Sequence, residues 1–452
     1  MKLFKNNKKN DKITKSKEII KKEKLKIKEE RKKQRKENFN KSLSGRIINK
    51  IFKKKQEDTE VLSLKEQIFS MLYFEIIGVI LCLVLLFALS GGRNYIKLYT
   101  DLKKLINVYD TITSNYYGDI NKDELIDSAI NSMVTSIGDN YTTYTNSKTK
   151  NEALEELEGT YEGIGCMVSM TQTGQIIVVN IFENSPAKNA GLEPNDIIIK
   201  IDDEDFSKKT SEEMAEYVKN SKKEKIKLTI KRKDEEKVLT IKRKKVEIPS
   251  VSSQVIEKDN KKIGYIDISI FSGVTYNQFK NNLEKIEKEG IEGLVIDVRS
   301  DTGGYLSAVT DISKLFLKKG STIYQLEDDK NKEKVLDDTK EHRQYPIAIL
   351  INGTSASASE ILASAIKESY NGIVIGTNSY GKGTVQKTRT LEDGSIIKYT
   401  AQKWLTPKGN WINEKGVEPT IKVELDVEKI SKGIDNQLET ALTEIMNKLK
   451  ED

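Results

Sequence analysis

The chain has 452 residues and a formal net charge of +7, but residues 1–67 hold 24 Lys or Arg against 10 Asp or Glu, so the remainder is net acidic. This distribution argues against a nucleic-acid-binding groove in the folded part of the chain. The one histidine and the two cysteines, Cys82 and Cys166, exclude a two-histidine zinc motif and a disulfide framework, and no metal or other cofactor is expected.

The N-terminal part of the chain predicts a membrane anchor. Residues 1–67 are rich in Lys and Glu and cannot bury a core, so we expect a basic cytoplasmic tail that is disordered or partly helical. Ile68–Ser90 carries a single charge, Glu75, and is long enough to span a bilayer as a transmembrane helix in contact with lipid. The preceding basic tail favours a single-pass protein of the cytoplasmic membrane with an extracytoplasmic body. Cleavage near Ala88-Leu89-Ser90 remains the alternative to an uncleaved anchor.

Residues 91–158 are predicted to be mostly helical. Their apolar side chains form two stripes at helical spacing. One stripe contains Leu102, Leu105, Ile106, Tyr109, Ile112 and Tyr116, and the other contains Leu125, Ile126, Ala129, Ile130 and Met133. The region ends at Gly138–Tyr144, which leads into the next domain. A helical hairpin that packs for stability alone also explains this pattern.

Residues 159–245 are rich in short apolar strands. The loop Gly163-Ile164-Gly165 precedes a strand at Cys166–Met170, and an S-P-A-x-x-A-G-L turn occupies Ser185–Leu192. This order resembles a PDZ domain. The consecutive backbone N–H groups of the glycine loop can cradle the C-terminal carboxylate of a peptide while the next strand pairs with that peptide. Taken alone, the two glycines are equally compatible with an ordinary turn.

Residues 246–426 alternate strands with helices, which predicts an α/β core. Strands are expected at Lys262–Phe271, Gly293–Arg299 and Ile347–Ile351, with a helix at Leu306–Lys318. Residues 427–452 are expected to form a C-terminal helix, either a contact in a homodimer or a packing helix. The fold expected for the chain is therefore multidomain α/β, with a transmembrane helix, a helical region, a PDZ domain and an α/β core.

A cluster of small residues, Asn352–Leu362, lies where the strand at Ile347–Ile351 turns into a helix at Ala358–Tyr370. The free N–H groups and the dipole at a helix N-terminus favour negative charge. A serine that attacks a carbonyl needs such donors for the oxyanion that forms. Ser357 and Glu360 also match the S-x-x-E capping box, which by itself favours a simple helix cap.

A second motif, Ser379–Gln386, places Lys382 between two glycines, 25 residues after Ser357. The only histidine, His342, lies in a polar run and is expected to be a solvated loop residue. A serine hydrolase with this sequence therefore needs a base other than histidine. The S-A-S-A-S-E-I and Y-G-K-G-T-V-Q motifs together resemble those of the carboxy-terminal processing, or tail-specific, serine peptidases. The resemblance extends from about Tyr99 to the C-terminus.

The resemblance implies a serine-type endopeptidase in which Ser357 is the nucleophile, Lys382 the general base and Gln386 the residue that orients the lysine. The oxyanion hole would consist of Ala358 and one residue of the D-x-R-x-x-x-G-G motif, either Gly303 or Gly304. This chain has Asp301-Thr302 where the family more often has Asn-Pro, which affects the geometry and charge of that loop. Glu368 is expected on the helix surface or in indirect support of the site. To act as a base near neutrality, a lysine must lose about 3 pKa units.

The expected partners are protein or peptide substrates with a free C-terminus. Two alternatives compete with this interpretation. A penicillin-binding or β-lactamase-like enzyme uses S-x-x-K, which occurs here five times, but no K-T-G accompanies it. A non-catalytic, membrane-tethered PDZ adaptor would use Ser357 only as a helix cap.

Overall fold

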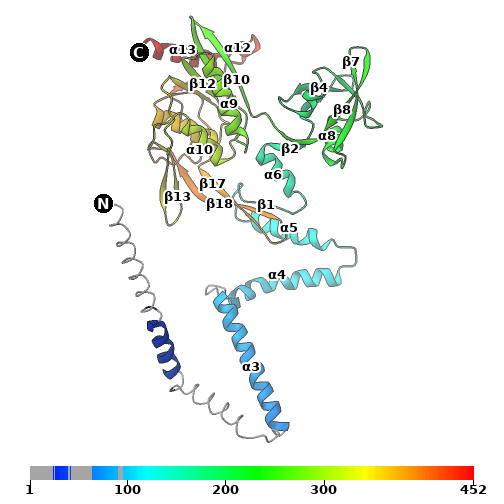
Figure 1. Ribbon diagram of the computed structural model, residues 1–452, viewed down its shortest axis with the longest axis vertical. Helices are drawn as coiled ribbons and strands as arrows, with labels where there is room; N and C mark the ends of the chain where they lie inside the picture. The colour runs from blue at the N-terminus through cyan, green and yellow to red at the C-terminus, as the bar shows by residue number, and fades with distance from the viewer. Residues whose placement is uncertain (1–23, 25, 39–40, 42–63, 90–94, 452) are drawn as a thin grey trace, which may run out of the picture. The chain divides into compact units, whose positions relative to one another are not determined.

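The computed structural model describes residues 24, 26–38, 41, 64–89 and 95–451, and it divides into two compact units, Met1–Asp119 and Ile120–Asp452 (Figure 1). Most of the basic tail expected at residues 1–67 lies outside the described residues, although residues 26–38 are helical.

In its described part, the first unit contains the long helices α3 (Leu64–Leu89) and α4 (Tyr95–Asn115). Apolar side chains of α3 such as Leu81 and Leu85 are exposed. Among the described residues, no helix has both the length and the apolarity needed to cross a membrane. The transmembrane helix expected at Ile68–Ser90 overlaps α3.

The second unit begins with α5 (Lys122–Thr135), β1 (Thr143–Thr145) and α6 (Lys150–Glu158). The short strand β1 pairs antiparallel with β18 (Ile396–Leu405), a strand more than 250 residues later in the chain. The Thr142 hydroxyl also accepts the N–H of Thr400 at 3.2 Å. Hydrogen bonds to β18 thus hold the stretch Gly138–Tyr144 against the C-terminal half of the unit.

The next part of the second unit is a small sheet with strand order β3-β4-β5-β7-β8, in which β6 pairs with β5. Its strands are β3 (Cys166–Met170), β4 (Ile176–Ile181), β5 (Ile197–Ile201), β6 (Glu204–Asp205), β7 (Lys225–Arg232) and β8 (Glu235–Lys242), and its helices are α7 (Pro186–Asn189) and α8 (Ser211–Asn220). Alternate residues of the strands, such as Ile176, Val178 and Ile230, are fully buried in one apolar core. Period-two burial of this kind is the pattern of a sheet with one solvated face.

The segments that lead into and out of this sheet lie next to each other. The strand β2 (Thr160–Gly163) pairs antiparallel with β9 (Lys244–Glu247). Just beyond this pair, the Ile248 N–H donates to the Gly159 carbonyl at 2.8 Å.

The α/β region is built on a six-stranded sheet of order β10-β11-β12-β15-β16-β19. The strands are β10 (Val251–Lys258), β11 (Lys261–Ile268), β12 (Gly293–Asp297), β15 (Ile347–Ile351), β16 (Ile373–Gly376) and β19 (Ile421–Lys422). All neighbours are parallel except β10 and β11. The strands β12 and β15 are buried along their whole length because both faces of the sheet are covered, and β15 is a continuous apolar run.

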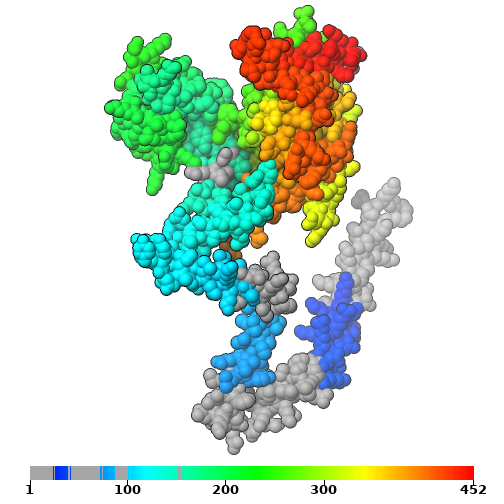
Figure 2. Space-filling view, turned by 180° about the vertical axis from the view of Figure 1, so that it is seen from behind, coloured from blue at the N-terminus to red at the C-terminus, as the bar shows by residue number. Residues whose placement is uncertain are grey.

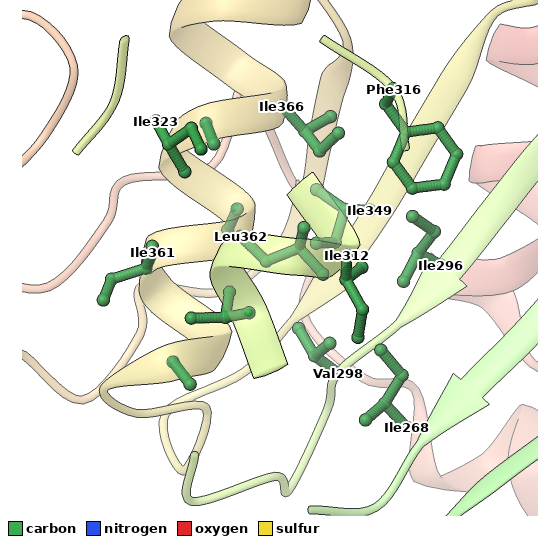
Figure 3. Packing of buried hydrophobic residues seen from close by; sticks show 14 of the residues in the cluster. Ile268, Ile296, Val298, Ile312, Phe316, Ile323, Ile349, Ile361, Leu362 and Ile366 are labelled. Carbon is green, nitrogen blue, oxygen red and sulfur yellow. The ribbon is translucent and has the colours of Figure 1, made fainter. Parts of the chain in front are cut away.

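Three helices cover one face of this sheet: α9 (Thr275–Lys288), α10 (Leu306–Lys314) and α11 (Ala358–Ala365). Figure 3 shows Leu362 of α11 and Ile312 of α10 close to the strand side chains Ile296 and Ile349. This core fixes α11, the helix that follows the loop at residues 352–357 (the serine loop).

The other face is covered by α13 (Asn436–Glu451), which follows the short helix α12 (Val427–Ser431). Ala441, Leu442 and Ile445 of α13 are buried against the sheet. In Figure 2 the C-terminal residues, in red, lie against the orange and yellow surface of the α/β region. The C-terminal helix was expected either to form a homodimer contact or to pack on its own chain, and the structure shows α13 packed on its own chain.

A second sheet completes the unit, with order β1-β18-β13-β14 and with β17 paired to β18. It contains β13 (Thr322–Glu327), β14 (Lys332–Leu336) and β17 (Thr384–Thr390) in addition to β1 and β18. Because β17 and β1 both pair with β18, the loop at residues 379–383 before β17 (the lysine loop) comes close to the stretch before β1.

Candidate active site

Two loops leave the carboxyl ends of the adjacent parallel strands β12 and β15, which is where α/β sheets commonly place their functional residues. The loops are joined by several hydrogen bonds. The Ala356 N–H and the Ser359 hydroxyl both donate to the carbonyl of Asp301, each at 3.0 Å. The Ser300 N–H donates to Asn352 Oδ1 at 2.9 Å. The loop at residues 298–304 after β12 and the serine loop after β15 are therefore held together by hydrogen bonds.

Ser357 stands at the turn from the serine loop into α11 with φ 55° and ψ −110°. A non-glycine residue in this region is strained by about 1–3 kcal/mol and persists only where its surroundings hold it. Its backbone N–H donates to Glu360 Oε2 at 2.8 Å. The side chain is half-buried. Strain of this kind, at a strand-to-helix turn, is typical of an exposed nucleophile.

Glu360 joins the serine loop to the lysine loop. The residue is fully buried in α11, a helix whose other residues are apolar or small. Its carboxylate accepts four hydrogen bonds, from the N–H groups of Ser357, Gly381 and Lys382 and from the Ser379 hydroxyl. A single oxygen, Oε2, lies 2.8 Å from the Ser357 nitrogen and 2.9 Å from the Lys382 nitrogen. Burial raises the pKa of Glu360, and the four hydrogen bonds act in the opposite direction.

The S-x-x-E motif predicts that Glu360 belongs to a helix cap. The structure shows that its carboxylate also accepts hydrogen bonds from the lysine loop. A signal for this role was available. One carboxylate within a helix that is otherwise apolar or small, and next to a buried strand, must find several donors because an unpaired buried charge is very costly.

The two glycines around Lys382 are required by crowding. A Cβ at Gly381 would lie 2.9 Å from the backbone nitrogens of residues 414–416. A Cβ at Gly383 would lie 2.7 Å from Trp411 Nε1. Between them, the Lys382 carbonyl accepts a hydrogen bond from Trp404 Nε1 at 2.7 Å. The lysine loop is thus fixed at its backbone on both sides of the lysine.

The Lys382 side chain is directed toward an aromatic ring. Nζ lies 4.4 Å from the centroid of Tyr141, a residue of the stretch before β1. Burial and, to a lesser extent, the charge of Lys398 lower the pKa of Lys382, while Glu360 and Asp139 oppose the shift. A lowered pKa is the direction that a general base requires. Within the described residues, no direct hydrogen bond joins Lys382 Nζ to Ser357 Oγ.

Gln386, at the start of β17, donates from Nε2 to the hydroxyls of Thr384 and Thr400, each at 3.1 Å. The structure gives it no hydrogen bond to Lys382, so its role in orienting the lysine stays a prediction.

The two candidate glycines of the oxyanion hole have different surroundings. A Cβ at Gly303 would lie 2.8 Å from Ser357 Cβ and 2.9 Å from the Ala358 nitrogen, so this glycine adjoins the nucleophile. A Cβ at Gly304 would instead lie 2.1 Å from the Phe271 carbonyl oxygen. Both positions exclude a side chain. The structure thus places Ala358 and Gly303 next to Ser357.

Asp301 lies directly before these glycines and has no solvent exposure. Its Oδ1 accepts the Gly303 N–H at 2.8 Å, whereas Oδ2 has no hydrogen-bond partner. Burial raises the pKa of Asp301 to about 7. The position where the sequence departs from the resembled motif therefore holds a carboxyl group that titrates near neutrality.

The expected peptide-binding loop lies at a groove of about 550 Å³ between β3 and α8. Apolar side chains line it, including Ile164, Cys166, Val168, Met214 and Val218. In the loop, Gly165 has φ +82°, and a Cβ there would lie 2.4 Å from Ser185 Cβ. Pairing of a peptide with β3 would place its last side chain in this groove.

Two residues considered in the sequence analysis, His342 and Glu368, lie outside the hydrogen-bond network around Glu360. His342 is exposed, and its Nε2 lies 2.8 Å from the side-chain nitrogen of Gln344. The Glu368 carboxylate accepts the N–H of Lys408 at 2.7 Å. Glu368 belongs to a π-helical turn, Ile366–Tyr370, that replaces the last part of the helix expected to Tyr370.

Three domain families match the chain: peptidase family S41 at residues 262–423, the PDZ domain at residues 162–242 and the activating protease CtpB N-terminal domain at residues 90–149. The carboxy-terminal processing protease CtpB of Bacillus subtilis strain 168 is 39% identical over 325 residues, which cover 71% of this chain and 68% of that protein. CtpA of the same strain is 36% identical over 324 residues, with coverage of 71% and 69%. A probable CtpA-like serine protease of Staphylococcus aureus strain MRSA252 is 35% identical over 327 residues, with coverage of 72% and 65%.

Proposed function

The chain belongs to the carboxy-terminal processing proteases of peptidase family S41, and we propose that it is a serine endopeptidase with Ser357 as nucleophile and Lys382 as general base. The observation that carries this proposal is the shared Glu360 carboxylate. One oxygen of Glu360 accepts hydrogen bonds from the backbone N–H groups of Ser357 and Lys382. The backbones of the two residues are therefore held next to each other.

In the proposed reaction, neutral Lys382 accepts the proton of Ser357 Oγ as that oxygen attacks the peptide carbonyl. The Ala358 N–H and an N–H of Gly303 or Gly304 stabilise the oxyanion. The protonated lysine then donates to the leaving amine, and water hydrolyses the acyl-enzyme. Burial of Lys382 favours the neutral form that the first step needs.

The dyad needs one side-chain movement. Lys382 Nζ contacts the Tyr141 ring and, in the described part of the chain, makes no hydrogen bond to Ser357 Oγ, so it has to move toward that oxygen. Gln386 is a candidate to receive the lysine in its new position, because it lies on β17 four residues further along the chain.

We also propose that the PDZ domain selects substrates by their free C-terminus. The glycine loop at Gly163–Gly165 would bind the carboxylate while the peptide extends β3. The apolar lining of the groove favours an apolar last residue. Peptides that end in a carboxylate should therefore be cleaved about tenfold faster, or more, than their C-amidated twins.

The site of action is a separate proposal. The apolar run at Ile68–Ser90 after a basic tail favours an extracytoplasmic body facing extracytoplasmic protein substrates. Protease added to intact cells without a wall should digest the body. Digestion only after lysis would contradict this orientation.

Cleavage of an internally quenched peptide with an apolar free C-terminus tests the reaction. Ser357→Ala and Lys382→Ala should each abolish cleavage with the thermal unfolding midpoint nearly unchanged. His342→Ala, at the exposed histidine, is the matched control and should keep full activity. Activity retained in Lys382→Ala would overturn the dyad. Tail binding without cleavage by the unmodified chain would favour the adaptor instead.

A further inference from the structure

The two glycines of the loop at residues 298–304 carry N–H groups with different partners. The Gly303 N–H donates to Asp301 Oδ1 at 2.8 Å, so it is already engaged. Within the part of the chain that the structure describes, the Gly304 N–H has no hydrogen-bond partner. An oxyanion needs a donor that is free and held in place before the reaction begins. Of the two glycines, Gly304 therefore offers the free N–H.

A bridge to Phe271 sets the direction of the Gly304 N–H. The Phe271 N–H donates to the Gly303 carbonyl at 3.0 Å, and the Tyr305 N–H donates to the Phe271 carbonyl at 2.6 Å. In a planar trans peptide the N–H points opposite to the carbonyl of the same unit. Because the Gly303 carbonyl faces Phe271, the Gly304 N–H faces away from it. The peptide unit that carries this N–H begins at the Cα of Gly303, where an added Cβ would lie 2.8 Å from Ser357 Cβ.

Asp301 holds this arrangement from inside the loop. Its side chain has no solvent exposure, Oδ1 accepts the Gly303 N–H, and Oδ2 has no hydrogen-bond partner. Its backbone carbonyl accepts the Ala356 N–H and the Ser359 hydroxyl, each at 3.0 Å, which ties the residue to the serine loop on both sides of the nucleophile. A buried polar atom without a partner calls for an explanation, and a catalytic function is one of the few that apply. The bond to Gly303 indicates which function that is.

We propose that Asp301 is a positioning residue for the oxyanion hole: its carboxyl group holds the Gly303 N–H inside the loop, so that the next N–H, that of Gly304, faces the reaction at Ser357. This inference rests on the proposed serine peptidase reaction. Without the acceptor, the Gly303 N–H is left without a partner, and two consecutive glycines have the backbone freedom to turn the peptide units around them. A turned unit no longer holds the Gly304 N–H in place.

The expected signature is a loss of turnover without a loss of substrate binding. An oxyanion donor acts on the transition state, so its displacement lowers kcat and kcat/KM equally and leaves KM unchanged. Removing one such donor outright costs about 100- to 1,000-fold in kcat. Asp301→Ala displaces the donor without removing it, so kcat should fall by about tenfold or more, with KM within about twofold of the original value.

Asp301→Asn is the conservative variant. The amide keeps an oxygen that accepts the Gly303 N–H in the same place. Burial raises the pKa of Asp301 to about 7, so at pH 6 the group is mostly the neutral acid, which an amide resembles. At this pH, Asp301→Asn should therefore keep kcat within about threefold of the unmodified chain, because the acceptor is preserved.

Asp337→Ala is the matched control. Asp337 is also buried, its Oδ1 accepts the N–H of the residue two positions further along, Thr339, at 2.7 Å, and its Oδ2 has no partner in the described part of the chain. Its backbone bonds to residues 320 and 321 instead of to the serine loop. The substitution thus removes the same kind of buried contact away from Ser357, and kcat should stay unchanged whatever the loss of stability.

The test measures cleavage of an internally quenched peptide at pH 6, and inhibition by the corresponding peptide aldehyde, in the full chain. The aldehyde carbon bonds to Ser357 Oγ, the carbonyl double bond opens onto its oxygen, and the Oγ proton passes to Lys382. The adduct is a hemiacetal anion in the oxyanion position, and no group leaves. Because this adduct resembles the transition state, the inhibition constant in Asp301→Ala should rise by about the factor by which kcat falls.

An unchanged kcat, or a rise in KM alone, in folded Asp301→Ala would overturn the positioning role and leave the serine peptidase standing. If the alanine variant does not fold, Asp301→Leu fills the same space without an acceptor and takes its place. A fall of about tenfold or more in kcat for Asp301→Asn would also overturn the positioning role, since the acceptor is still present. Cleavage by Ser357→Ala would instead overturn the proposed reaction, and the positioning role with it.

Discussion

Lys382 Nζ lies 4.4 Å from the centroid of the Tyr141 ring, so the proposed base rests on an aromatic face contributed by a segment about 240 residues earlier in the chain. A ring at this distance stabilises an ammonium group by about 0.5–2 kcal/mol. Tyr141 therefore favours the charged form of the lysine, against the effect of burial. The contact both positions the side chain and moderates its loss of charge.

Replacing the aromatic ring should shift the pH profile of the enzyme. Tyr141→Leu removes an interaction that favours the ammonium, so the pKa of Lys382 should fall further. The acidic limb of kcat/KM then moves to lower pH, by about 0.4 to 1.5 units. The other charged groups that act on the lysine, Lys398, Glu360 and Asp139, are unchanged by this substitution. Tyr141→Phe keeps the ring and should leave the limb near its original pH. An unshifted limb in Tyr141→Leu would show that the ring does not influence the base.

The shared carboxylate should be sensitive to a change of one atom. Glu360→Gln replaces an oxygen that accepts hydrogen bonds with an N–H₂ group that faces backbone donors. Leaving about two buried donors without a partner costs roughly 2–5 kcal/mol. We expect the free energy of unfolding to fall by this amount and kcat/KM to fall at least a hundredfold, because both loops lose their common anchor. Denaturant unfolding and peptide cleavage measure the two effects.

Glu368→Gln is the matched control for this change. Glu368 lies eight residues further along the chain, and its carboxylate accepts a single bond, from the Lys408 N–H. The same chemical change there should cost about 1 kcal/mol or less and spare the activity. Equal losses in the two variants would contradict a special role for Glu360.

The titration of Asp301 should be visible in the stability of the protein. Its folded pKa, about 7, is above the ordinary value of 3.8, so the folded state holds a proton that the unfolded state has released. Between these two values stability falls as pH rises, by roughly 4 kcal/mol in total, and the loss is complete above pH 7. Asp301→Asn cannot titrate. Its stability relative to the unmodified chain should therefore increase from pH 4 to pH 8, as measured by denaturant unfolding at each pH. A difference independent of pH would contradict the raised pKa.

Crowding at the lysine loop can be separated from backbone strain by comparing two glycines. Gly381 and Gly320 have nearly the same φ, +90° and +88°, but only at Gly381 would an added Cβ lie 2.9 Å from backbone nitrogens. Gly381→Ala should reduce kcat/KM at least a hundredfold by displacing Lys382. Gly320→Ala meets nothing within 4 Å and should cost only about 1 kcal/mol of conformational strain, without loss of activity. Similar activity in the two variants would refute the steric argument.

Local pattern was sufficient to predict where several of the candidate residues lie in the fold. The apolar run before Ser357, the small residues around it and the two glycines beside Lys382 each have a local physical reason, and the structure places them at a strand end, a helix start and a crowded loop. The matches to known proteins then confirmed the family suggested by the two motifs together.

The remaining features depend on contacts between distant segments. Tyr141 reaches Lys382 because β1 and β17 share the strand β18, and nothing in the stretch Gly138–Tyr144 by itself specifies that pairing. Such positions are set by tertiary packing rather than by local propensity.

The pairing of β2 with β9 makes the PDZ region a removable insert. Its first and last strands run antiparallel from Thr160↔Glu247 to Gly163↔Lys244, and the Ile248 N–H already bonds the Gly159 carbonyl at 2.8 Å. If residues 160–247 were removed, the two ends left in the rest of the chain, at residues 159 and 248, would therefore already be in contact. Domains inserted in this way can be gained or lost without rerouting the surrounding chain. Joining residue 159 to residue 248 through a short turn should leave the α/β region intact. A different recognition domain could then be inserted at the same position.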